Sequence, residues 1–148
     1  MANTQAMCSS FKQELLTGTH VIGTDVLKIA LFNASAGGLS SATTAYATTI
    51  NTATEVSNSG SYAAGGSTVT FQAPALSGTT AYTGPTSAST VSWTTFSATN
   101  FDCALIYNST KTNKAISVHT FASQTITAGT FTITFPTNAA GTALINLA

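Results

Sequence analysis

Large apolar residues alternate with threonine in the segment 130–136, close to the C-terminus. Phe131, Ile133 and Phe135 occupy every second position, and Pro136 ends the run. Successive side chains of a β-strand point to opposite faces, so this segment places three large apolar groups on one face and hydroxyl groups on the other. The pattern predicts a strand with one face buried in a hydrophobic core.

Segments rich in β-branched and aromatic residues recur along the chain, and turn-forming residues separate them. A hairpin is expected where 103–107 and 115–121 flank the polar turn 108–114. About eight strands without intervening helices predict an all-β fold, an antiparallel sandwich or jelly-roll-like domain with one short N-terminal helix. The predicted strands are 26–32, 67–73, 90–96, 103–107, 115–121, 125–127, 130–135 and 142–147.

The N-terminal helix is predicted over residues 5–16. Thr4 is a suitable N-cap, and Met7, Phe11 and Leu15 follow at intervals of four residues, which gives one apolar stripe. A helix of about three turns needs tertiary contacts to be stable. We expect the stripe to cap the β core of the same chain, with docking on a neighbouring subunit as the alternative.

The chain is predicted to form a single β domain over residues 1–148, because no Pro-rich or Gly/Ser linker divides it. The β body is expected at 24–148. Within it, the stretch 33–66 is rich in Thr, Ser, Ala and Gly and poor in large apolar residues, which predicts a long loop or arm. A further loop, containing Gly78, is expected before the strand at 90–96.

The chain is almost uncharged, with four Lys and Arg, four Asp and Glu, and a formal net charge of zero. Charged residues make up 5 % of the sequence, against about 25 % in an ordinary soluble domain. No basic surface is available for nucleic acid or an anionic membrane. Thr, Ser and Ala occupy 71 of the 148 positions, and such a surface lacks the charge repulsion that keeps monomers apart. We expect a homo-oligomer within an assembly; the alternative is a secreted, adhesin-type β domain.

The two cysteines, Cys8 and Cys103, lie far apart in apolar surroundings, and neither belongs to a CxxC motif. Buried free thiols are the expected state. The N-terminal segment lacks the basic and apolar regions of a secretory signal, and no apolar run is long enough to cross a membrane. We therefore expect the protein to be made in a reducing cytoplasm and to make no contact with membranes.

Few residues have side chains that could take part in catalysis or metal binding. Ser117 and His119 share one face of a predicted strand, and Asp102 completes a possible hydrolase triad, but no nucleophile elbow is present. The carboxylates Asp25 and Glu55 are scattered, and no spacing typical of a metal site occurs. We expect no catalytic residue, no cofactor and no metal site.

A sugar-stacking platform is the remaining possibility for a binding site. Tyr46, Tyr62, Tyr82 and Trp93 are the candidate aromatic residues, but they belong to separate segments. Aromatic side chains in such positions are more often anchors of a core or an interface.

Several segments resemble small proteins encoded by tailed phages, many of which infect cyanobacteria. The segments that carry the resemblance occur in the same order and are Met7–Leu16, Leu27–Phe32, Ala104–Ser109, Asn113–Ala115 and Phe131–Pro136. These motifs are structural rather than catalytic. The resemblance implies a virion structural protein, and it assigns no functional residues.

Among virion roles, the residues favour a capsid cement or decoration protein. Proteins with this role are commonly compact β domains and are often trimers. Such a protein would bind the major capsid protein on the outer surface of the mature capsid. The alternatives are a head-fibre or tail-associated protein that recognises host glycans, and a small hydrolase. Convergence of Trp93, His119 and Asp102 in one pocket would favour the alternatives, and their dispersal would favour the cement role.

Overall fold

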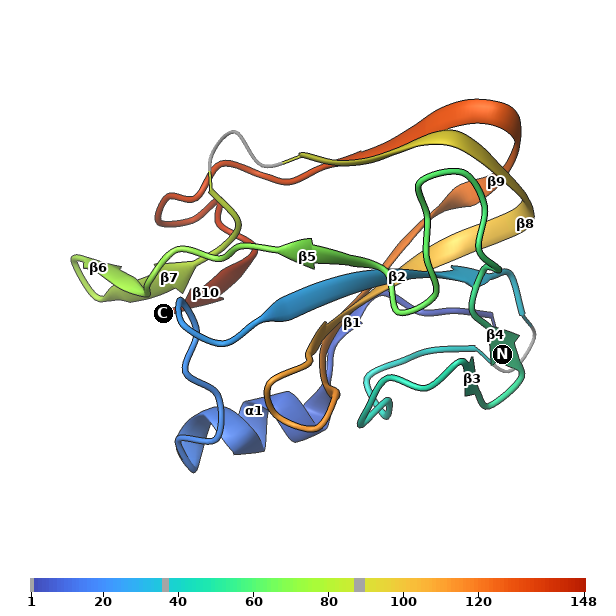
Figure 1. Ribbon diagram of the computed structural model, residues 1–148. Helices are drawn as coiled ribbons and strands as arrows, with labels where there is room; N and C mark the ends of the chain where they lie inside the picture. The colour runs from blue at the N-terminus through green and yellow to red at the C-terminus, as the bar shows by residue number, and fades with distance from the viewer. Residues whose placement is uncertain (1, 36–37, 87–89) are drawn as a thin grey trace.

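Antiparallel β-strands make up most of the structure, a computed structural model that describes residues 2–35, 38–86 and 90–148 (Figure 1). The expected all-β class, with antiparallel sheets packed together and one short helix, is confirmed. The elements are β1 (Ala6–Met7), α1 (Ser9–Leu16), β2 (Leu27–Asn33), β3 (Thr49–Ile50), β4 (Ala53–Thr54), β5 (Ser67–Val69), β6 (Ala75–Ser77), β7 (Thr80–Thr83), β8 (Thr90–Asn108), β9 (Lys114–Thr134) and β10 (Ile145–Leu147).

The strands form one main sheet and two smaller ones. The main sheet has the order β1-β9-β8-β2-β5, and a second sheet has the order β10-β7-β6. A small hairpin of β3 and β4 is the third. All of these strand pairs are antiparallel.

The predicted hairpin around 108–114 is confirmed, but its strands are much longer than expected. The predicted strands 90–96 and 103–107 are both parts of β8, and 115–121, 125–127 and 130–135 all fall in or at the end of β9. Between the predicted strands, the ladder of β8 and β9 shifts register at several β-bulges. At a bulge the strand bends without ending.

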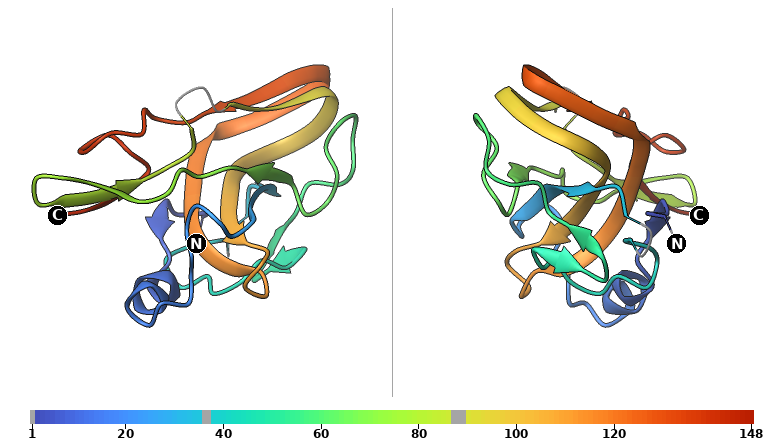
Figure 2. Two further views of the ribbon diagram at one scale, coloured as in Figure 1. Left: turned by 60° about the vertical axis from the view of Figure 1, so that its left-hand side comes forward. Right: turned by 90° about the vertical axis from the view of Figure 1, so that its right-hand side faces the viewer.

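The bulges bend the β8–β9 hairpin into an arch, so its two halves lie in different layers (Figure 2). Thr95, Asn100 and Ala128 have positive φ angles in this region, which L-residues seldom adopt outside bends. The half nearest the turn pairs with β2. The other half folds over the sheet, where the Trp93 indole nitrogen donates to the Ser67 hydroxyl of β5 at 2.8 Å.

Aromatic rings fill the inside of the arch. Phe131 of β9 stacks on Trp93 with ring centres 6.1 Å apart, and it contacts Phe101 edge-on at 4.9 Å. Phe96 contacts Phe101 edge-on at 5.5 Å. Trp93, Phe96 and Phe101 are at most 1 % exposed, so the arch closes over a continuous core.

The predicted helix begins later than expected, and Thr4 is not its N-cap. Helix α1 starts at Ser9, and Cys8 occupies the N-cap position in an extended conformation. Residues 6–7 form β1 instead, paired with Ser117 and Val118 of β9. The edge of β9 offers backbone hydrogen bonds to this segment, including Cys8 N–H to the Ile116 carbonyl at 2.9 Å, and these replace the first helical turn.

Helix α1 nevertheless covers the β body, as its stripe predicts. Phe11 is completely buried in the core, and Leu15 is partly buried against it. Met7 also packs against the core, but from β1 and not from the helix. The stripe therefore identified the buried residues correctly even where the helix boundary was wrong.

The stretch 33–66 lies on the β body, with residues 36–37 outside the described residues. Its Leu39, Val56 and Tyr62 are buried in the core, and Val56 N–H donates to the Leu31 carbonyl at 2.9 Å. Gly66 has a φ of +69°, and a Cβ there would collide with the backbone of Ile29. Only glycine allows this close approach to β2.

Three expectations for the short strands are wrong. The segment expected to be a loop contains the hairpin of β6 and β7, with Gly78 at a φ of +59° in its turn. The predicted strand 67–73 ends at Val69, and only 145–147 of the predicted strand 142–147 is extended. These strands are three or four residues long, too short for a period-two pattern to identify them.

Phe11→Ala should lower the free energy of unfolding by about 3–5 kcal/mol, because it leaves a cavity under α1. Lys12→Ala, on the exposed side of the same helix, is the matched control and should change it by less than about 0.5 kcal/mol. Urea denaturation followed by circular dichroism measures both. Equal stability of the two variants would show that α1 does not anchor the body.

Candidate functional site

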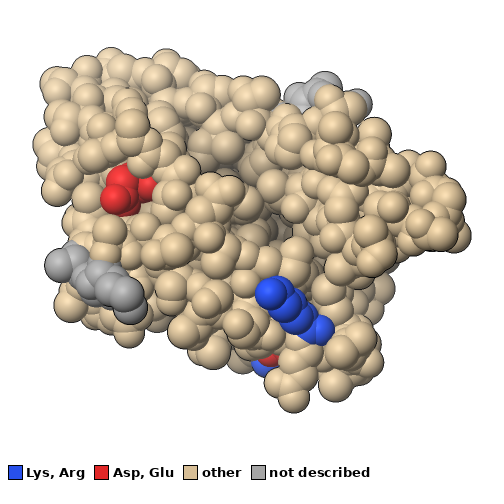
Figure 3. Space-filling model, turned by 180° about the vertical axis from the view of Figure 1, so that it is seen from behind, with Lys and Arg blue, Asp and Glu red and all other residues tan. Residues whose placement is uncertain are grey.

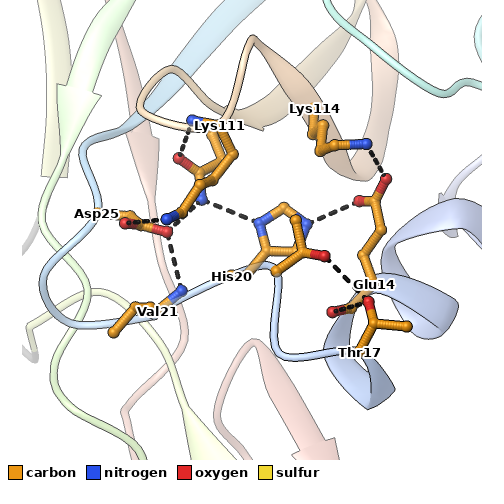
Figure 4. Close-up of polar contacts among 9 residues, drawn as sticks. Glu14, Thr17, His20, Val21, Asp25, Lys111 and Lys114 are labelled. Atoms are coloured by element: carbon orange, nitrogen blue, oxygen red, sulfur yellow. Dashed lines mark hydrogen bonds and ion pairs between the residues drawn. The ribbon is translucent and has the colours of Figure 1, made fainter.

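Charged groups are sparse on the surface seen in Figure 3, and half of the chain's charged side chains gather in one place (Figure 4). This charged cluster joins the end of α1, the loop after it and the tip of the β8–β9 hairpin. It consists of Glu14, His20, Asp25, Asn108, Lys111 and Lys114.

His20 lies at the centre of the charged cluster, and its side chain is fully buried. The Asn108 amide nitrogen, which can only donate, lies 2.9 Å from Nδ1. Nε2 therefore carries the proton and donates to the Glu14 carboxylate at 2.8 Å. The ring also contacts Phe11 edge-on, with centres 4.9 Å apart. Both ring nitrogens are engaged, so His20 has none left to exchange a proton with a ligand.

Two carboxylates at the ends of the cluster are held ionised. Burial raises the pKa of the Glu14 carboxyl, but hydrogen bonds from Lys114 and His20 outweigh this and bring the pKa below its ordinary value. Burial likewise raises the pKa of Asp25, and hydrogen bonds from Val21 N–H and Asn108 outweigh it, so this pKa is also lowered. The cluster is thus a structural clamp between α1 and the hairpin tip.

A second polar site surrounds Glu55, which is 5 % exposed. One carboxylate oxygen accepts a hydrogen bond from the Tyr46 hydroxyl at 2.6 Å. The other accepts from the Tyr62 hydroxyl and from Gly65 N–H, both at 2.7 Å. Burial and the bond to Glu55 raise the pKa of both tyrosines. The three donors satisfy the buried carboxylate and tie the stretch 33–66 together.

The possible triad that the sequence offered is not connected through Asp102 by hydrogen bonds. The Ser117 hydroxyl lies 2.9 Å from Nε2 of His119, but the Asp102 carboxylate accepts a hydrogen bond from the Asn3 side chain. Burial lowers the pKa of His119, which favours its neutral form. Trp93 is buried elsewhere, beneath the arch. Of these three residues, His119 lines a surface cleft to which neither Trp93 nor Asp102 contributes, so they do not converge there.

The four candidate aromatic residues do not form a platform for sugars. Tyr62 and Trp93 meet at 5.4 Å, but inside the core. Tyr46 stacks on Tyr107 at 4.4 Å. Tyr82 lies apart from them, on β7. Tyr62 and Trp93 are buried core residues, and Tyr46 is partly buried against the core. Tyr82 is also partly exposed.

Two clefts at the surface differ in polarity. A polar cleft of about 280 Å³ lies between the stretch 56–59 and the bend of β8, lined by uncharged groups of Asn33, Ser57, Asn58 and Thr99. A mainly apolar cleft of about 200 Å³ contains His119 and lies between β9 and the C-terminal segment.

The two cysteines are buried and unpaired, and burial raises the pKa of each thiol to about 12. Within the described ranges, no group of three or more His, Cys, Asp or Glu side chains could hold a metal ion. None of the helical structure in those ranges is long and apolar enough to span a membrane.

Comparison of the sequence with models of known protein families gave no match, and comparisons with curated proteins and with solved structures gave none either.

The charged cluster should make stability depend on pH in the acid range. Glu14 and Asp25 have lower pKa values in the folded chain than their ordinary values, so their ionised forms stabilise the fold at neutral pH. This contribution is lost as the pH falls from about 5 through the folded pKa values. We expect the double variant Glu14→Gln, Asp25→Asn to be less stable than the wild type at pH 7, with the difference shrinking in acid. Urea midpoints measured across this range test it; a constant difference would contradict it.

Removal of the Tyr62 hydroxyl should weaken the Glu55 site. Tyr62→Phe leaves the buried Leu31 N–H, which donates to that hydroxyl at 3.0 Å, and one Glu55 oxygen each short of a partner. We expect a loss of about 1–3 kcal/mol in the free energy of unfolding. Tyr82→Phe is the control, because the Tyr82 hydroxyl makes no hydrogen bond to another described residue. Similar stability of both variants would remove the structural role assigned to Glu55.

Proposed function

We propose that this chain is a structural protein of a tailed-phage virion, a cement or decoration protein that binds the outside of the mature capsid and stabilises contacts between major capsid subunits. The role is non-catalytic and needs no cofactor. The protein is made in the host cytoplasm and acts on the capsid surface as a homo-oligomer, with a trimer favoured.

The observation that carries the proposal is the uncharged surface. Four of the eight charged side chains belong to the charged cluster, and Glu55 is buried, which leaves Lys12, Lys28 and Asp102. A surface of hydroxyl and small apolar groups suits a contact that is repeated at many equivalent places and selected by shape more than by charge.

The mechanical properties of the fold also support the proposal. We expect a continuous two-stranded arch, closed by an aromatic core and clamped at its tip by the charged cluster, to resist bending. A brace that binds only the mature shell stabilises that shell by mass action, by RT ln(1 + [L]/Kd) for each site. The cleft at His119 contains neither Trp93 nor Asp102, and this favours the cement role over a hydrolase.

One observation favours a second candidate, a head-fibre or tail-associated protein that recognises host glycans. The polar cleft is lined by uncharged amide and hydroxyl groups, which match the hydroxyl groups of a neutral sugar. An aromatic ring on which a sugar could stack is missing from its lining. For this reason the cement role is the preferred proposal.

Co-sedimentation with expanded capsids that lack decoration tests the proposal. The capsids are assembled from the major capsid protein of the same phage, and bound protein is quantified after pelleting. We expect stoichiometric binding and an increase in the melting temperature of the particle. Unexpanded shells are the control, since a cement protein binds them weakly.

Failure to bind either shell would overturn the cement role. Glycan binding by the wild type would then be compared with Ser57→Ala and Thr99→Val, which remove hydroxyl groups from the polar cleft. Loss of glycan binding in these variants would establish the second candidate.

A further inference from the structure

Exposed apolar side chains gather at one end of the molecule. Among the described residues, all five large hydrophobic side chains that are exposed lie at the end of α1, in the loop 17–26 or in the β10-β7-β6 sheet. Figure 1 shows these elements together at the end that carries the C-terminus. The five residues are Leu16, Val21, Val26, Leu76 and Leu147.

The strand register places two of these leucines on one face of the small sheet. Ala81 of β7 is paired with Leu76 of β6 on one side and with Leu147 of β10 on the other. Directly opposed residues share a face of a sheet, so the three side chains lie in one row. Leu76 is 72 % exposed and Leu147 is 51 % exposed. Ile145, two residues before Leu147 and on the same face, is 4 % exposed, so the row continues into the core.

An apolar groove runs between this row and helix α1. Its volume is about 70 Å³, and it is lined by Phe11, Leu15, Ile22, Pro74 and Leu147 among others. The row and the groove together form what we call the apolar face. Clustered apolar groups of this kind on a surface that is otherwise polar mark contact sites.

The small sheet also has two unpaired edges. It ends at β6 on one side and at β10 on the other, and no other strand of the described residues pairs with either. Exposed edges offer backbone N–H and C=O groups to another strand. An edge beside exposed leucines can therefore gain both hydrogen bonds and apolar burial from one partner.

We propose that the apolar face is an interface between two copies of this chain. None of the residues that form the row and the groove is charged, so two identical faces can meet without like charges being opposed or buried. The net charge of zero removes long-range repulsion between copies. Two equal sheet edges can also pair in antiparallel fashion about a two-fold axis. The contact is independent of capsid binding. Because it joins identical faces it gives a dimer, which takes the place of the trimer favoured in the proposed function.

Sedimentation equilibrium over a wide concentration range tests the proposal, with Leu76→Asp and Leu147→Asp as the variants. Both side chains are exposed, so neither change should prevent folding, which circular dichroism and thermal melting verify. We expect the wild type to associate and each variant to do so at least about tenfold more weakly, because a buried unpaired carboxylate is costly. Thr127→Asp, exposed on β9, is the matched control and should associate like the wild type.

A wild type that stays monomeric at all concentrations would overturn the proposal, as would folded variants that associate normally. Capsid co-sedimentation of the same variants separates this inference from the proposed function. Variants that are monomeric but still bind capsids support the interface between copies. Variants that associate normally but no longer bind capsids would assign the apolar face to the capsid and overturn it.

Discussion

The bend in the β8–β9 hairpin is the constraint on which the rest of the structure depends. β8 alone has 19 residues, which would extend roughly 60 Å if straight. The bulges fold this ribbon back, so its two halves become opposing walls of one core. Phe131 then stacks on Trp93 and meets Phe101 at the bend edge-on. Strands β2 and β5, helix α1 and the stretch 33–66 complete a core whose shape the hairpin has already set.

Most of the chain's few charged groups make contacts within the fold. The charged cluster connects α1 to a hairpin tip far away in sequence, as in the pair of Glu14 and Lys114. Glu55 is satisfied by neutral donors and requires no cation. Protonation of these carboxylates in acid would weaken the connections. The residues that pair with one another, and so add little charge to the surface, therefore also hold the elements of the fold together. The pairing of charges within the fold thus accounts both for the nearly neutral surface and for the contacts between α1 and the hairpin tip.

The sequence predicted what depends on local patterns. Alternation identified the strand face that holds Phe131, and the stripe identified Phe11, because both patterns reflect burial directly. The start of α1 could not be found, since residues 6–7 are held by the edge of β9, more than a hundred positions away. The charged cluster was missed for the same reason: nothing in the sequence near Glu14 or Asp25 indicates that a distant turn supplies their lysines.

The molecule presents two surfaces with different physical properties. The apolar face gains free energy from burial, which is non-directional and depends little on the partner's detailed geometry. The hydroxyl-rich remainder gains little from burial and binds well only where shape and hydrogen bonds match. In the proposed arrangement, contacts between copies form at the apolar face, which leaves the hydroxyl-rich surface for the proposed capsid partner. Apolar burial would then assemble the protein with itself, and shape matching would select its position on a regular shell.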